Sequence, residues 1–301
     1  ASMLTADELE VFECLRDEPA PRAGRLRPFT VMIMKATRLC NLRCTYCNQW
    51  RDGPNQIMGF EVLARATRDV LRAPGVRRVE FVWHGGEATL LPIAFYRKAL
   101  WLQEQFRTPG QSVNNVMQTN ATRVSDAWLE FWKRYGFAIG VSLDGPPEIH
   151  DLRRLDVAGR PTAARVRAGL SRLAEASIRH GVLMVVDEAT VEAGPRRLLD
   201  YLLEIGVAQI DLLNVLPRNT PAGVPLAGPY LSWPRYVEFL RDVFRLWWPE
   251  HAGRISIREL DGLVGQLRGE PASTCVFAGD CFGGFLTVEP SGDVSACDKY
   301  V

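Results

Sequence analysis

Residues Thr30 to Asn48 read TVMIMKATRLCNLRCTYCN, an apolar run that leads directly into three cysteines. The apolar part, Thr30 to Ala36, predicts a buried β-strand. Cys40, Cys44 and Cys47 are separated by three and then two residues, so one loop can present three thiolates to a single four-iron cluster. The fourth iron would then lack a protein ligand and could bind a small molecule. The stretch therefore predicts a strand followed by a loop whose cluster takes part in chemistry.

A zinc site or three buried cysteines are the alternatives, because Cys-x-x-Cys pairs are common zinc ligands. Zinc would need a fourth ligand nearby, and the cysteine that follows Cys47 is Cys275. The whole pattern, with Tyr46 directly before the third cysteine, resembles the signature of the radical S-adenosylmethionine (SAM) enzymes. The resemblance implies that SAM binds the open iron of a 4Fe-4S cluster, and that its reductive cleavage gives a 5′-deoxyadenosyl radical. It also implies that Tyr46 lies near the adenine of SAM.

The composition is that of a globular enzyme and excludes several other classes. The chain has 301 residues, of which 47% are hydrophobic and 24% charged, with a net charge of +1. Basic residues are scattered, which argues against a nucleic-acid partner. No apolar run approaches the roughly 20 residues of a membrane span, and no secretory signal precedes the first strand. We therefore expect a cytoplasmic protein with no membrane partner.

The chain alternates strand patterns with helical periods. After the first strand, strand patterns recur at 76–83, 113–118, 137–143, 182–186 and 210–216. Six strands separated by helices predict parallel βαβ units in an α/β fold. This favours a partial (β/α)6 TIM-like barrel, which the family resemblance also implies. We expect an N-terminal helix and linker over 1–25, the barrel over 26–254 and a small C-terminal β-hairpin domain for an auxiliary cluster over 255–301.

The loop after the second strand reads His84-Gly85-Gly86-Glu87. Two glycines allow the backbone to approach a ligand closely and to adopt positive φ. The segment resembles the Gly-Gly-Glu-Pro motif of the family, which implies that Gly85, Gly86 and Glu87 bind the amino group of SAM. Ala88 replaces the proline, which removes some rigidity but keeps the binding groups. An ordinary glycine turn is the alternative.

The loops after the third and fourth strands carry further candidates, because barrel chemistry sits at the carboxyl ends of the strands. Gln118 and Asn120 follow the third strand, and Ser142 ends the fourth. Their segments resemble those around SAM in the family, with Ser142 as a partner of the SAM carboxylate. Arg154 is placed to bind the same carboxylate with its planar guanidinium. A surface arginine is the alternative, and Arg153 competes for the role.

The C-terminal segment contains Cys275, Cys281 and Cys297. A hairpin that turns at 291–293 is predicted between the second and the third of these cysteines. The arrangement resembles the start of a SPASM domain, which implies an auxiliary 4Fe-4S cluster on these three cysteines. A structural zinc site or free thiols are the alternatives. Full SPASM domains continue with further cysteines, whereas this sequence ends at Val301. A shortened, twitch-like domain and a longer natural chain both remain open.

Asp298 matches the aspartate of a Cys-Asp-x-Tyr segment at 297–300. The segment resembles one in the anaerobic sulfatase-maturating enzymes, and the resemblance implies that Asp298 is a general base. A carboxylate suits this role because loss of a hydrogen atom from the substrate makes its neighbouring O–H or S–H far more acidic. A solvated turn aspartate is the alternative. Lys299 stands where relatives have an aromatic residue and could neutralise the carboxylate.

The resemblance to sulfatase-maturating enzymes and peptide maturases implies an oxidoreductase that modifies a residue of a peptide or protein substrate. The product would be formylglycine in a sulfatase, or a crosslinked or otherwise modified ribosomal peptide. A one-electron donor such as flavodoxin or ferredoxin is the implied partner. The alternatives are a radical SAM dehydrogenase of a small metabolite and, more remotely, a zinc-binding module.

Overall fold

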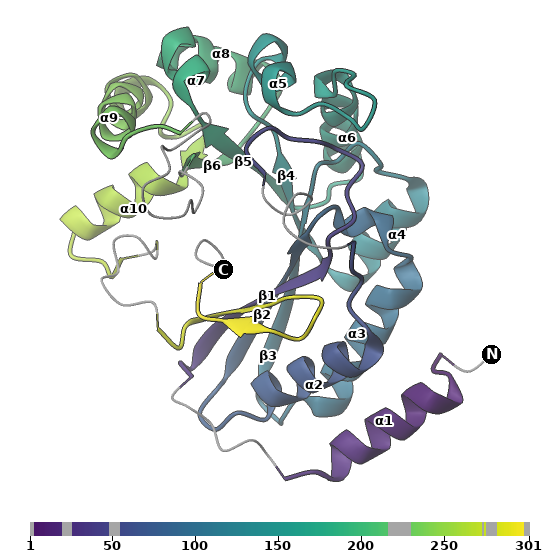
Figure 1. Ribbon diagram of the computed structural model, residues 1–301. Helices are drawn as coiled ribbons and strands as arrows, with labels where there is room; N and C mark the ends of the chain where they lie inside the picture. The colour runs from purple at the N-terminus through teal and green to yellow at the C-terminus, as the bar shows by residue number, and fades with distance from the viewer. Residues whose placement is uncertain are drawn as a thin grey trace, which may run out of the picture.

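The computed structural model describes residues 3–19, 26–47, 55–215, 230–272, 274 and 282–297. Within these residues the strands form one nine-stranded sheet, curved into a partial barrel (Figure 1). The strands are β1 (Phe29–Thr37), β2 (Arg78–Gly85), β3 (Ser112–Thr119), β4 (Ala138–Ser142), β5 (His180–Val186), β6 (Gln209–Asn214), β7 (Ser256–Ile257), β8 (Phe285–Val288) and β9 (Val294–Ser295). Their order is β7-β6-β5-β4-β3-β2-β1-β8-β9, and every neighbouring pair except β8 and β9 is parallel.

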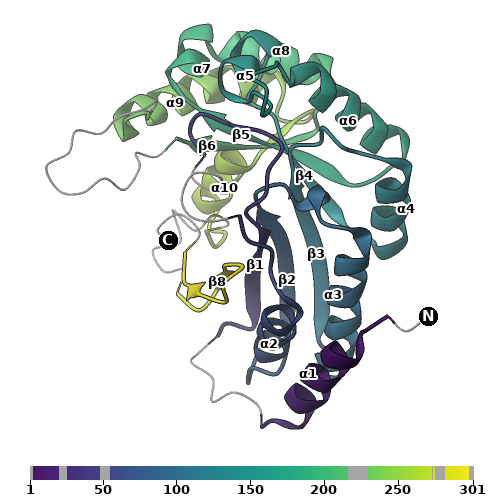
Figure 2. The same cartoon turned by 45° about the vertical axis from the view of Figure 1, so that its right-hand side comes forward.

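Helices cover the outer face of the sheet, as the turned view in Figure 2 shows. They are α1 (Ala6–Asp17), α2 (Phe60–Leu71), the 3-10 turn η1 (Ala88–Leu90), α3 (Ile93–Phe106), α4 (Asp126–Tyr135), α5 (Pro147–Arg153), α6 (Ala163–Glu175), α7 (Glu188–Ala193), α8 (Pro195–Glu204), α9 (Trp233–Glu250) and α10 (Arg258–Leu267). No helix in these described ranges combines the length and the apolar character needed to span a bilayer.

The alternation of side chains along each strand separates the core from the barrel interior. On β2, Val79, Phe81 and Trp83 are fully buried against the helices, whereas the residues between them are partly exposed. The ring of Trp83 meets that of Tyr96 on α3 edge to face, with centroids 5.4 Å apart. This two-residue period places the hydrophobic core between sheet and helices and leaves polar side chains to line the interior.

The structure confirms the α/β partial barrel and all six strands predicted from the sequence, each within two residues at either end. The N-terminal helix also begins as its capping box predicts. The backbone N–H of Glu8 donates to the Thr5 hydroxyl at 3.2 Å, and the Thr5 N–H donates to the Glu8 carboxylate at 2.9 Å. The periodic signals were therefore sufficient for the main architecture.

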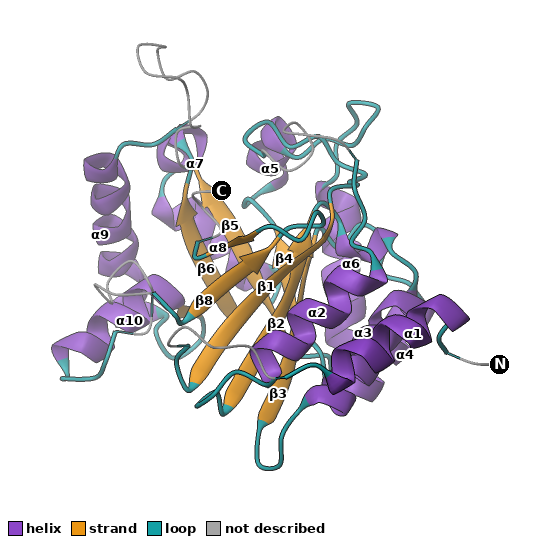
Figure 3. Ribbon diagram, turned by 60° about the horizontal axis from the view of Figure 1, so that its bottom comes forward, coloured by secondary structure: helices purple, strands orange, loops and turns teal. Residues whose placement is uncertain are grey.

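The C-terminal hairpin was predicted, but its position in the sheet was not. β8 and β9 pair antiparallel, and β8 also pairs in parallel with β1, so the hairpin extends the barrel sheet beyond β1 (Figure 3). The register places Val31 opposite Phe285 and Ile33 opposite Thr287. The segment that contains Cys297 is thereby attached to the strand that leads into the cysteine loop.

Candidate functional site

The cysteine loop leaves the carboxyl end of β1 and turns tightly. The backbone N–H of Leu42 donates to the Cys40 sulfur at 3.3 Å, and the N–H of Cys47 donates to the Cys44 carbonyl at 3.2 Å. All three cysteines are thiols outside any disulfide, and Cys44 is buried. The loop therefore presents three reduced sulfurs from one short turn.

Burial controls the protonation of these thiols. It is the main reason why the pKa of Cys40 is raised to about 12 and that of Cys44 to about 11, although Arg154 opposes the rise at Cys44. Both sulfurs therefore stay protonated near neutral pH until a cation replaces the protons, as ligand thiols do when metal binds. In the described part of the chain no three His, Cys, Asp or Glu side chains are close enough to share one metal ion. Cluster ligation differs in this respect, because each thiolate binds its own iron.

The segment after α5 holds the cysteine loop along its length. Leu42 and Asp156 form an isolated antiparallel bridge. The N–H of Arg43 donates to the Leu155 carbonyl at 2.7 Å, and that of Thr45 to the Arg153 carbonyl at 3.0 Å. These backbone bonds fix the loop against a second, rigid segment, so the sulfurs are positioned before any cluster binds.

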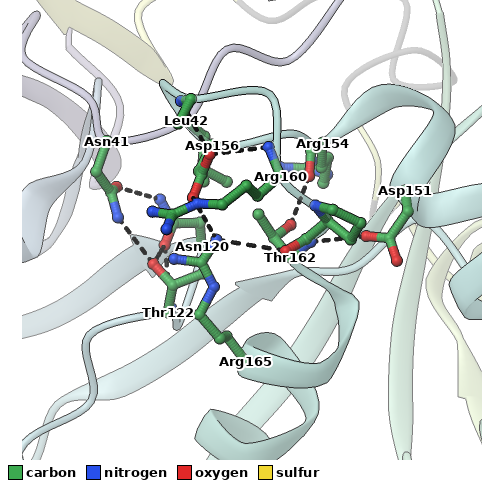
Figure 4. Close-up of polar contacts among 12 residues, drawn as sticks. Asn41, Leu42, Asn120, Thr122, Asp151, Arg154, Asp156, Arg160, Thr162 and Arg165 are labelled. Atoms are coloured by element: carbon green, nitrogen blue, oxygen red, sulfur yellow. Dashed lines mark hydrogen bonds and ion pairs between the residues drawn. The ribbon is translucent and has the colours of Figure 1, made fainter.

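A polar network links the same loop to the end of β3 (Figure 4). Asn120 Nδ2 donates to Asn41 Oδ1 at 2.9 Å, and Asn41 Nδ2 donates to the Thr122 hydroxyl at 2.9 Å. Thr122 in turn donates through its hydroxyl to Asn120 Oδ1 at 2.7 Å. Asn120 was expected to contact SAM, and in this structure its amide supports the cysteine loop.

The two glycines of the second loop are required because the chain passes close to them. A Cβ on Gly85 would lie 2.3 Å from the Thr37 carbonyl oxygen, and one on Gly86 would lie 2.1 Å from that of Leu39. Gly85 also has a φ of 115°, which disfavours any other residue. The close approach expected from the sequence is therefore made, in this structure, by the backbone that leads to the cysteines.

The carboxylate of Glu87 is buried and accepts four hydrogen bonds. Its Oε1 accepts from the Thr89 N–H at 3.0 Å, the Thr89 hydroxyl at 2.5 Å and the Thr119 hydroxyl at 2.6 Å. Its Oε2 accepts from the Asn120 N–H at 2.7 Å. Glu87 therefore joins the ends of β2 and β3, and the remaining acceptor capacity is on Oε2. Its expected contact with the SAM amino group stays a prediction.

Gln118 and Ser142 lie side by side on the inner face of the sheet. Gln118 Nε2 donates to the Ser142 hydroxyl at 2.9 Å. A Cβ on Gly140 would lie 2.0 Å from Gln118 Oε1, so the glycine lets the amide lie across β4 in this position. Both residues belong to adjacent strand ends, as the sequence indicated, and their role toward SAM stays a prediction.

Arg154 lies at the centre of a buried group of polar side chains. Its Nε donates to Asp144 Oδ2 at 2.8 Å, and the hydroxyl of Tyr46 donates to the same oxygen at 2.6 Å. The guanidinium carbon is 5.5 Å from the centroid of the Tyr46 ring, and Nη1 is 3.9 Å from the Cys44 sulfur. Burial opposes the charge of Arg154, but Asp144, Tyr46 and Cys44 together outweigh it and raise the pKa of the guanidinium. A fixed cation thus faces the cysteine loop.

Arg153, the rival of Arg154, points elsewhere. Its Nε donates to Asp187 Oδ2 at 2.5 Å, and Asp187 caps the N-terminus of α7 by accepting from the Thr190 N–H. This placement favours Arg154 over Arg153 as the arginine near the cluster.

His150 supports this group from behind as a neutral imidazole. Its Nδ1 accepts from the Asp144 N–H at 3.2 Å, so the proton is on Nε2, 3.0 Å from the Thr162 hydroxyl. Thr162 then donates to the Arg154 carbonyl at 2.5 Å. Complete burial lowers the pKa of His150 to about 4.

Three predicted site residues, Cys275, Cys281 and Asp298, lie outside the described residues. Cys297 follows β9 as a partly exposed thiol outside any disulfide, and its carbonyl accepts from the Ser295 hydroxyl at 3.2 Å.

Sequence reasoning assigned no role to Asp144, His150 or Asp156, although each is buried and bonded within the site. Asp144 had a usable signal, because it ends the fourth strand in the segment Ser142-Leu143-Asp144-Gly145. Nothing in the sequence marked Asp156 as the residue that would pair with Leu42 across 114 positions of the chain.

Comparisons with known proteins agree with this arrangement. Residues 34–194 match the model of the Radical SAM superfamily. A serine-type anaerobic sulfatase-maturating enzyme of Bacteroides thetaiotaomicron is 29% identical over 294 residues, covering 91% of this chain and 70% of the relative. A cysteine-type anaerobic sulfatase-maturating enzyme of Clostridium perfringens is 31% identical over 284 residues, covering 91% of this chain and 75% of the relative.

A solved structure, native anSMEcpe with bound AdoMet and Cp18Cys peptide, is similar to this fold. It superposes with a TM-score of 0.79 at 31% sequence identity, covering 91% of this chain and 75% of that chain.

Proposed function

The chain belongs to the radical SAM superfamily and, within it, to the anaerobic sulfatase-maturating enzymes, and from this we propose that it oxidises a seryl or cysteinyl side chain of a sulfatase to formylglycine. It is an iron-sulfur enzyme that acts on a protein or peptide substrate. Similarity at 31% identity to a structure with both AdoMet and a peptide supports the substrate class. Free thiols meant for a cluster suit a reducing compartment, so we place the reaction in the cytoplasm.

One observation carries the proposal. Three cysteines on one short loop carry thiols, Nη1 of the buried Arg154 lies 3.9 Å from the Cys44 sulfur, and the Gly-Gly-Glu turn packs directly against the same loop. These residues fit a 4Fe-4S cluster with an open iron and an amino acid-like ligand. When bound, this cluster and SAM supply the 5′-deoxyadenosyl radical.

The residues of the chain bind and orient. We assign Cys40, Cys44 and Cys47 to the cluster, and Arg154 to the carboxylate of SAM as a charge-assisted hydrogen-bond donor. Asp144 holds that guanidinium in place and Tyr46 closes over it. We assign neutral hydrogen bonds to SAM to Ser142 and Gln118. The wall of the SAM site is assigned to the residues of the neighbouring loops, Gly85, Gly86, Glu87 and Asn120.

The C-terminal segment supplies the rest of the proposal. We assign Cys275, Cys281 and Cys297 to an auxiliary 4Fe-4S cluster. We assign Asp298 as the general base that accepts the proton of the substrate hydroxyl or thiol. The attachment of β8 to β1 supports this, because it keeps the segment before Cys297 at the barrel. A flavodoxin or ferredoxin would provide the initiating electron.

Mass spectrometry of a sulfatase-derived peptide after anaerobic turnover with SAM and reductant tests the proposal. Conversion of serine to formylglycine removes two hydrogens, and conversion of cysteine replaces a thiol by an aldehyde oxygen. Asp298→Asn should still cleave SAM but lose product by about 10²-fold, the scale of general-base loss. An unmodified peptide alongside efficient SAM cleavage would reject the sulfatase assignment.

A further inference from the structure

The cysteine loop presents a cation to solvent. Arg43 lies between Cys40 and Cys44 and is exposed. Its Nη1 donates to the carbonyl oxygens of Cys40 at 2.9 Å and Leu42 at 2.7 Å, so the guanidinium is held flat against the outer side of the loop. The loop that carries the cluster cysteines therefore places one positive charge at the surface.

Two more arginines adjoin the loop through Asp156. This carboxylate accepts from Arg160 Nε and Arg165 Nη2, both at 2.9 Å, while its backbone bridges to Leu42 (Figure 4). The arginine side chains are 73% and 42% exposed, whereas Asp156 is buried. Two cations share one buried anion, so the surface here carries positive charge.

A hollow of about 320 Å³ continues this surface on the side of α4. It is lined by Thr89, Arg123, Val124, Ser125, Trp128 and Arg172. Arg123 is exposed and directly follows Thr122, whose hydroxyl accepts from Asn41 in the cysteine loop at 2.9 Å. Arg172 pairs with Asp126 at the hollow's edge. We call Arg43, Arg123, Arg160, Arg165 and Arg172 the arginine face.

We propose that the arginine face is the docking site for an acidic one-electron carrier protein of the flavodoxin class. The inference rests on the proposed function, which requires one electron to reach the cluster from outside. In the step, the flavin hydroquinone loses one electron to become a semiquinone, the cluster gains that electron, and no covalent bond forms. Positive charge beside the cluster loop steers an acidic partner and raises its rate of association.

Charge distribution favours an acidic protein over a nucleic acid. The arginine face is broad, but Asp126 and Asp156 are interleaved with its cations. A phosphate backbone would meet the exposed carboxylate of Asp126 at close range, and the whole chain has a net charge of only +1. A carrier protein can place its acidic side chains opposite individual arginines instead.

The test compares R123E/R160E with the control R241E/R245E, which makes the same charge change on exposed positions of α9, on another side of the barrel (Figure 1). Asp156 keeps its bonds from Arg165 and from the backbone N–H groups of Ala158 and residue 160 in this variant, so the cysteine loop keeps its support. Binding of a bacterial flavodoxin is measured by calorimetry at low salt, and SAM cleavage is measured with reduced flavodoxin or with dithionite. We expect R123E/R160E to weaken flavodoxin binding and slow flavodoxin-driven cleavage by about 10-fold, in the range of steering effects. Dithionite-driven cleavage should stay within about 2-fold of wild type.

A milder variant, R123Q/R160Q, removes charge without reversing it and should give an intermediate loss of flavodoxin binding that disappears at high salt. Unchanged flavodoxin binding in both variants would overturn the proposal. So would an equal loss with dithionite, which would put these arginines in the cleavage chemistry, or preferential binding of an RNA oligomer over flavodoxin. If wild type fails to cleave SAM with either reductant, the proposed function fails, and the binding measurement still decides the docking site.

Discussion

Replacing Glu87 with glutamine should destabilise the protein although the side chain keeps its size. Oε1 accepts three hydrogen bonds, from Thr89 N–H, Thr89 hydroxyl and Thr119 hydroxyl, and Oε2 accepts one from the Asn120 N–H. A glutamine amide has one carbonyl oxygen and one NH2 donor. If the carbonyl oxygen keeps the three donors, the NH2 group faces the Asn120 N–H, donor against donor.

The cost follows from the burial of the site. Glu87 is 1% exposed, so water cannot take the place of the lost acceptor. A buried donor without a partner costs about 1–3 kcal/mol, and hydrogen bonds to a charged acceptor are worth about 1 kcal/mol more than neutral ones. We therefore expect Glu87→Gln to lower the free energy of unfolding by about 2–4 kcal/mol. Because Asn120 also bonds to Asn41, the cysteine loop should loosen as well.

Urea unfolding of the cluster-free protein, followed by circular dichroism, measures this change. Glu61→Gln is the matched control, because that side chain is 66% exposed on α2 and lies 3.6 Å from Arg65. Glu61→Gln should lower the free energy of unfolding by less than about 0.5 kcal/mol, as for other exposed ion pairs. A loss below about 1 kcal/mol for Glu87→Gln would contradict the inference that four hydrogen bonds converge on a dry carboxylate.

Other residues of the site give further expectations. Cys40→Ala should abolish 5′-deoxyadenosine formation under dithionite after reconstitution, and wild-type yield would refute its ligand role. Arg154→Ala should weaken SAM binding by about 1.5–3 kcal/mol in calorimetry, with Arg153→Ala doing much less, and the reverse order would exchange their roles. Because burial lowers the pKa of His150 to about 4, the unfolded state takes up a proton first as pH falls below about 6.5. The free energy of unfolding, measured with urea, should therefore fall by roughly 1.4 kcal/mol for each pH unit between pH 6.5 and 4. His150→Asn should remove this pH dependence.

The sequence predicted those parts of the site that depend on local order. A strand followed by a loop is a local pattern, so the positions of Cys40, Glu87, Gln118 and Ser142 at one rim followed from the barrel rule. Partners could not be predicted in the same way. Glu87 was expected to face a ligand, and its four donors come from the ends of two strands that only tertiary structure brings together.

Long-range polar pairing was the part that sequence could not supply. Asp144 bonds to Tyr46 and Arg154, which lie 98 and 10 residues away. Its place at the end of the fourth strand suggested a site residue, but nothing in the sequence indicated which residues it would bond to. A charged side chain requires a bonding partner when it is buried away from water, and the fold determines whether it is buried.

The attachment of β8 has a similar cause, and one buried ion pair explains its register. β8 has four residues, too few for pattern alone to assign a parallel partner. Just beyond it, Glu289 Oε1 lies 2.7 Å from Lys35 Nζ and Oε2 lies 3.0 Å from Arg38 Nη2, with Lys35 and Glu289 both buried. A shift of β8 by one residue would separate these charges inside the protein, which costs several kcal/mol.

The ion pairs of Glu289 connect the C-terminal hairpin to the strand before the cysteine loop. Lys35 lies in β1 and Arg38 is two residues before Cys40, whereas Glu289 begins the turn that leads to Cys297. Apolar contacts alone would let a four-residue strand slide by two positions with little penalty, because side chains of the same face would still be buried. The ion pairs admit a single register. The position of the C-terminal cysteine relative to the cysteine loop is therefore set by charge, while the packing of β8 supplies the attraction that keeps it on the sheet.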